Sequence, residues 1–133
     1  MVTEQGTRVP RGGRGVVCGV WAAAGAAHLC TAFLGVPAGP VGTAVALVLA
    51  AAGLVGAGVL AVGGRPPMLL VAAALGLVGV AVFLLPRILP VPGFGALVGN
   101  LTDPWAFGGF LLDGLLVRLA VFTLRRTERA PAS

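Results

Sequence analysis

Four long apolar runs, separated by short polar or Pro/Gly-rich stretches, dominate the pattern of this chain. They predict helices over residues 16–36, 41–62, 67–85 and 104–124. Each run is close to the roughly 20 residues that an α-helix needs to cross a hydrocarbon core about 30 Å thick. The pattern therefore predicts an all-α, polytopic membrane protein whose four helices form an antiparallel transmembrane bundle.

The stretches outside these runs have their own signals. Residues 1–15 are rich in Gly and Arg and predict a flexible cytoplasmic tail, and residues 125–133 predict a second one. The first run exceeds the 7–15 apolar residues that are usual in a signal peptide, so we expect it to stay as a membrane helix. The connection 86–103 is broken by Pro and Gly, which leaves open whether it lies at the interface or dips into the membrane.

Composition and charge placement agree with this architecture. Hydrophobic residues make up 58% of the chain and charged residues only 10%, which excludes an ordinary soluble domain. The formal net charge is +5, but its arginines are unevenly placed, because the predicted topology leaves only Arg87 on the side away from the termini. The opposite side receives Arg8, Arg11, Arg14, Arg65, Arg125, Arg126 and Arg129. Positive charge favours the inner face, so we expect both termini to be cytoplasmic, in a cell membrane.

Two ionisable residues inside the apolar runs are the strongest candidates for a site. His28 lies about 12 Å from the outer end of the first predicted helix, and Asp113 lies at a similar depth in the fourth. First and last helices are neighbours in an up-and-down bundle, so the two side chains are expected to meet. Such an intramembrane pair could hold or pass a proton, or it could only fix helix packing.

Two arginines are further candidates, as contacts for an anion or a lipid headgroup. Arg118 is poorly aimed at Asp113, and either reaches towards the inner headgroups or faces a cavity or second buried pair. Arg87 either pairs with Asp103 or binds an anionic headgroup or ligand. The sequence Asp103-Pro104 also predicts a helix start, with Asp103 as its N-cap.

The remaining chemistry is sparse, which shapes the expected function. There is no second histidine and no clustered metal-ligand spacing, so we predict no metal and no cofactor, and an enzyme is disfavoured. Small-residue spacings such as Gly53/Ala57 and Ala72/Gly76 favour close helix packing. The main hypothesis is therefore an accessory or interaction protein, and the alternative is a small proton- or ion-coupled transporter using His28 and Asp113. The expected partners are the lipid bilayer and further copies of the chain or a larger membrane complex, not nucleic acid.

The chain also resembles a group of small proteins. His28 in the first run, Arg87 followed by a Pro/Gly-rich connection, and Asp113 in the fourth run resemble small four-helix integral membrane proteins of GC-rich actinobacteria. The resemblance covers residues 16–124 and implies a four-helix membrane fold, with no activity attached. The chain departs from four-helix multidrug exporters, because it has no Glu in its first helix, and from DoxX-like oxidoreductase subunits.

Overall fold

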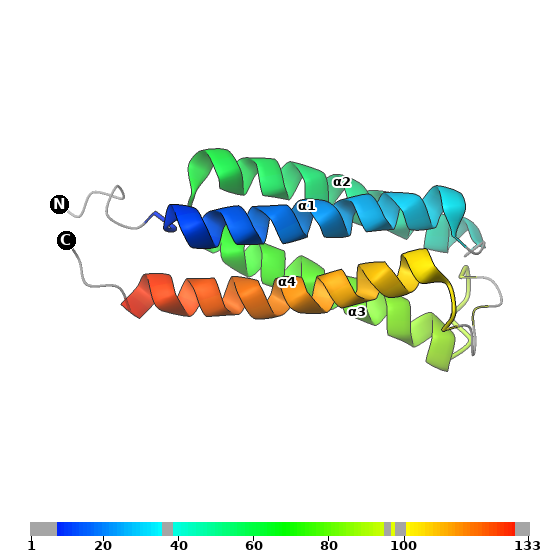
Figure 1. Cartoon of the computed structure of the whole chain (residues 1–133). Helices are drawn as coiled ribbons and strands as arrows, with labels where there is room; N and C mark the ends of the chain where they lie inside the picture. Colours follow the sequence, from blue (N-terminus) through cyan, green and yellow to red (C-terminus); the bar gives the residue numbers. More distant parts are fainter. Residues whose placement is uncertain (1–7, 36–38, 95–96, 98–100, 130–133) are drawn as a thin grey trace.

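Four helices run up and down beside one another in the computed structural model, which describes residues 8–35, 39–94, 97 and 101–129. They are α1 (Arg11–Leu34), α2 (Gly39–Gly63), α3 (Pro67–Ile88) and α4 (Pro104–Arg129). Helices that follow one another along the chain are in contact, and α1 also packs on α4, so the bundle closes on itself (Figure 1). The start of α1 and the end of α4 lie at the same end of the bundle, and the described residues contain no strand.

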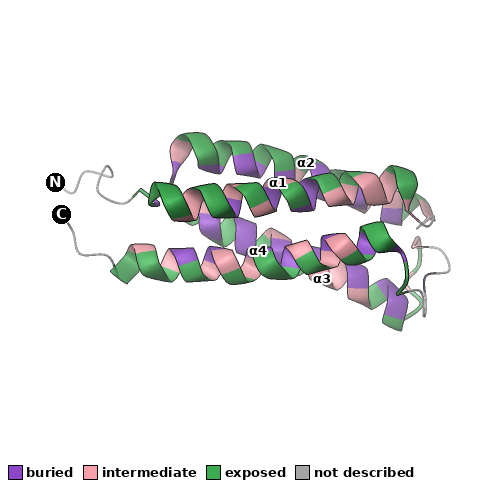
Figure 2. Cartoon of the chain, viewed as in Figure 1, coloured by how far each residue is buried: buried purple, intermediate pink, exposed green. Residues whose placement is uncertain are grey.

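The outer surface of this bundle is apolar. All four helices are long and apolar enough to cross a membrane. Large side chains such as Phe33, Val62 and Phe122 are exposed, and exposed positions alternate with buried ones along every helix (Figure 2). Apolar exposure of this extent is typical of a surface that faces lipid rather than water. The chain is a multi-pass membrane protein, and the predicted all-α four-helix bundle is confirmed.

Two helices extend beyond their predicted ends. Helix α1 begins at Arg11 instead of residue 16, and α4 continues to Arg129 instead of residue 124. The Val9 amide donates to the Gly64 carbonyl at 2.8 Å, which fixes the chain just before α1 against the end of α2. This contact joins two segments that are far apart in the sequence, so the local sequence could not indicate it. The prediction of a flexible tail was therefore wrong for the Gly/Arg-rich start of α1.

Helix α3 also runs past its expected end at residue 85 and includes Pro86 and Arg87. Proline lacks an N–H, so one carbonyl of the preceding turn loses its usual donor. The cost is small this near the helix end, where the last carbonyls lack intrahelical partners in any case. The Arg87 Nη1 donates to the Phe83 carbonyl at 2.9 Å and so supports this last turn from the side chain.

The half of the bundle nearest the termini is tightly filled. Trp21 of α1 is 1% exposed and lies against Gly56 of α2, where an added Cβ would overlap the indole ring. A Cβ built on Gly53 would lie 2.9 Å from the Cα of Gly25, so α1 and α2 approach closely here. The other large, fully buried side chains are Val17, Leu60, Leu69 and Leu116. They fill the centre of this half with apolar side chains.

The predicted small-residue positions lie inside this packing. Gly53, Ala57, Ala72 and Gly76 are all buried within the single chain. At Gly76 an added Cβ would lie 2.8 Å from the Asp113 carbonyl oxygen, so α3 and α4 touch through their backbones. Small residues allow this close approach. These four positions therefore stabilise the bundle itself and are not open for contact with a second protein.

Candidate functional site

The two candidate residues inside the apolar helices are in direct contact. The Nε2 atom of His28, on α1, lies 2.8 Å from the Oδ2 atom of Asp113, on α4. Their side chains are 12% and 4% exposed. The predicted contact is therefore present, and it depends on α1 and α4 being neighbours. A hydrogen bond between an imidazole and a carboxylate satisfies two groups that would each be costly alone in an apolar interior.

Two glycines lie beside this pair, and one of them, Gly79, leaves the space that the Asp113 carboxylate fills. A Cβ added at Gly79 of α3 would overlap the Asp113 carboxylate, so α3 lies directly over that group. A Cβ added at Gly109 of α4 would lie 3.8 Å from both Cε1 and Nδ1 of His28, which is ordinary contact. The carboxylate is therefore enclosed by the His28 ring on one side and by the α3 backbone on another.

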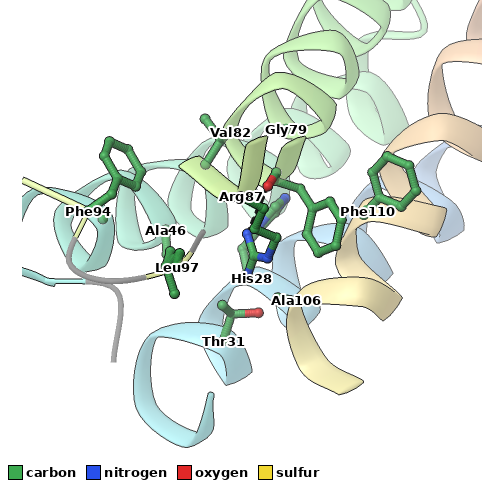
Figure 3. Close-up of a pocket in the computed structure, with 12 residues that line it drawn as sticks. His28, Thr31, Ala46, Gly79, Val82, Arg87, Phe94, Leu97, Ala106 and Phe110 are labelled. Carbon is green, nitrogen blue, oxygen red and sulfur yellow. Dashed lines mark hydrogen bonds between the residues drawn. The ribbon is translucent and has the colours of Figure 1, made fainter. Parts of the chain in front are cut away.

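A cavity of about 50 Å³ adjoins His28 in the half of the bundle away from the termini. Its walls come from all four helices and from the connection between α3 and α4. Figure 3 shows His28 and Thr31 on α1, Arg87 on α3 and Phe110 on α4 around this space. The remaining lining residues are Gly42, Ala46, Gly79, Val82, Phe83, Phe94, Leu97 and Ala106. About 10–15 Å³ is enough for one water molecule, so the cavity has room for several atoms.

A second, smaller cavity of about 10 Å³ also adjoins the pair. His28 and Asp113 both line it, together with Trp21 and Leu116 from the tightly filled half. His28 thus borders both cavities. The pair therefore stands where the wider space in one half of the bundle meets the packed core of the other half.

Arg87 forms part of the wall of the larger cavity and is 8% exposed. Its guanidinium carbon lies 4.1 Å from the centre of the Phe83 ring, within the range of a cation–π contact. The negative charge of Asp103 also acts favourably on Arg87, which agrees with the predicted pairing of these residues. An anion contact at Arg87 stays a prediction.

Asp103 has the predicted position at the start of α4. Its Oδ1 accepts a hydrogen bond from the Trp105 amide at 3.1 Å, and its carbonyl accepts one from the Phe107 amide at 2.9 Å. A side-chain oxygen bonded to the second helical amide is the usual action of an N-cap. The connection thus ends on a residue that fixes α4 and also interacts with Arg87.

Arg118 is separate from this site. Its side chain is exposed on α4, and it lines neither cavity. Arg118 therefore lines neither of these two cavities, and its exposure is also unlike that of a buried pair. The remaining alternative, a side chain that reaches towards lipid headgroups, stays a prediction.

Three residues of the site escaped the sequence analysis. Thr31 follows His28 by one helical turn on the same face, and its hydroxyl donates to the Ala27 carbonyl at 2.8 Å. Phe83 precedes Arg87 by one turn and stacks on Phe110 with ring centres 4.6 Å apart. The helical spacing from His28 and from Arg87 was the signal that could have found Thr31 and Phe83. Phe110 gave no such signal, because it joins the site only through the packing of α3 on α4.

No group of three or more His, Cys, Asp or Glu in the described ranges could hold a metal ion. Comparison with protein-family models, with curated proteins and with solved structures finds no match for this chain. The chemistry of the site therefore has to be worked out from its own residues.

Proposed function

We propose that this protein is a small proton-coupled membrane transporter in which the His28–Asp113 pair binds the proton. The observation that carries the proposal is the place of the pair, at the boundary between a cavity of about 50 Å³ and the packed core. Intramembrane ionisable residues next to such a space are typical of ion and proton pathways.

The pair has the composition that proton exchange requires. An imidazole and a carboxylate in hydrogen-bond contact can hold one proton between them, and a second proton neutralises the carboxylate and weakens their attraction. Breaking the 2.8 Å bond between them would remove a polar contact between α1 and α4 at this depth. Proton binding is thereby linked to the contact between two helices, which is the kind of element that a transporter must move.

Dicyclohexylcarbodiimide, an apolar reagent that reacts with protonated carboxyl groups, tests this proposal. We expect modification of Asp113 to increase as the pH falls. With two protons on the pair, the Asp113 carboxyl group is itself protonated and can react. Mass spectrometry of the α4 peptide locates the modification, and Asp113→Asn is the control. A carboxyl group that does not react at any pH, or reacts equally at all pH values, would contradict proton binding at this pair.

The proposed orientation places both termini in the cytoplasm of a cell membrane. Its support is the clustering of arginines at the end of the bundle that carries the termini, with Arg87 at the other end. In a background without Cys18 and Cys30, a cysteine at Leu101 is expected to react with an impermeant reagent added to intact cells. A cysteine at Arg65 is expected to stay unmodified, and the reverse result would mean the opposite orientation.

An accessory or interaction protein is the second candidate. Gly12, Gly15 and Gly19 lie on one side of α1, and a Cβ added at any of them would meet nothing within 4 Å. A face of this kind favours contact with another membrane helix. In that case the His28–Asp113 pair would only hold the bundle together, and Asp113→Asn would lower stability without changing proton movement across a membrane.

A further inference from the structure

We propose that the larger cavity binds a small monocarboxylate whose binding brings one proton into the protein. This inference rests on the proposed function and names the class of solute that the transporter would carry. It starts from the cavity walls, where Arg87, one of the few buried charged residues, meets His28 and a group of aromatic side chains.

The walls match the two ends of a short carboxylic acid. Arg87 and His28 supply N–H donors and positive charge, and a planar guanidinium fits a carboxylate well. Phe83, Phe110 and Val82 supply an apolar surface for a short hydrocarbon tail. At about 10–15 Å³ for each water-sized atom group, a space of about 50 Å³ suits a ligand of about three to five non-hydrogen atoms.

The balance of charge predicts the proton. The ionisable groups at the site are His28 from α1, Arg87 from α3, Asp113 from α4, and Asp103, which acts on Arg87. The sequence of α2 contains no ionisable side chain. With one proton shared between His28 and Asp113, the four groups sum to zero. An added carboxylate would leave one unpaired negative charge in an apolar interior, which is costly. One further proton at the His28–Asp113 pair restores neutrality.

Propionate is a suitable probe, and titration calorimetry of the full chain in detergent measures its binding. Repeating the titration in two buffers with different heats of ionisation gives the number of protons taken up. We expect about one proton for each propionate bound, as the charge balance requires. In the double variant with His28→Leu and Asp113→Leu, no group of the pair remains to take the proton, so we expect propionate to bind more weakly and without proton uptake.

Variants at the two arginines separate a specific site from general attraction. Arg87→Gln is expected to weaken propionate binding by about tenfold or more, and Arg87→Lys by less, because lysine keeps the charge but loses the planar fork. Arg118→Gln, which changes an exposed arginine outside the cavity, is expected to leave binding unchanged. A thermal unfolding curve for each variant shows whether it is folded.

Any of three results would overturn the carboxylate site. The wild-type chain could fail to bind propionate, it could bind propionate without taking up a proton, or it could bind chloride as tightly as propionate. If carbodiimide modification of Asp113 still depended on pH, the proposed proton function would stand while this ligand class would be wrong. If that dependence were also absent, both proposals would be wrong.

Discussion

Replacing Gly79 by alanine is expected to lower the free energy of unfolding by about 2–6 kcal/mol, although it adds a single methyl group. The new Cβ would overlap the Asp113 carboxylate, so the Asp113 side chain would have to turn away from His28. Overpacking a filled site costs about 1–3 kcal/mol, and leaving a buried polar group without its partner costs a similar amount. The free energies of unfolding of the wild-type chain and of Gly79→Ala, measured in the same detergent, give the sum of the two costs.

Gly58→Ala is the matched control for this prediction. Gly58 is also a helical glycine, but a Cβ there would meet nothing within 4 Å. Alanine in the middle of a helix is then favoured over glycine by about 0.5–1 kcal/mol. Adding Gly79→Ala to Asp113→Ala should cost much less than adding it to the wild type, because the carboxylate is gone. Equal costs in the two backgrounds would show that the overlap with Asp113 is not the cause.

Removing either partner of the His28–Asp113 pair should have the second large effect. His28→Leu leaves a buried carboxylate, and Asp113→Leu leaves a buried imidazole, each at a typical cost of about 1–3 kcal/mol. The double variant leaves neither group unpaired, so it should recover part of the summed loss. Leucine keeps the branching of aspartate, with two methyl groups in place of the two carboxylate oxygens.

A double-mutant cycle on unfolding in detergent gives the coupling between the two side chains. We expect a coupling of about 1 kcal/mol or more, as for residues in direct contact. The pair Arg118→Leu and His28→Leu serves as a control, because Arg118 lies outside the site, and its effects should add. Additive losses for His28→Leu and Asp113→Leu would mean that the two side chains do not interact in the protein.

The architecture was predictable from the sequence because membrane helices are defined by length and composition. Lipid excludes unsatisfied backbone groups, so an apolar run of about 20 residues has few alternatives to a helix. The meeting of His28 and Asp113 followed from depth along each helix and from the closing of α1 on α4. Both inferences use regular geometry, which a sequence encodes directly.

Other features depended on tertiary contacts that the sequence does not encode locally. The start of α1 at Arg11 is accompanied by the bond from Val9 to Gly64, just after the end of α2. The continuation of α3 past Pro86 is accompanied by a bond from the Arg87 side chain to its own helix. The cavity is the space that remains after four helices and a connection have packed, so no single segment could have indicated it.

The state of the His28 ring tests most directly whether His28 and Asp113 act as a pair. His28 is the single histidine of the chain, so ¹⁵N labelling of histidine gives resonances from one imidazole. We expect Asp113→Asn to displace the Nε2 resonance, because that nitrogen loses its carboxylate partner. An Nε2 resonance that is the same in the wild-type chain and in Asp113→Asn would contradict a His28–Asp113 pair.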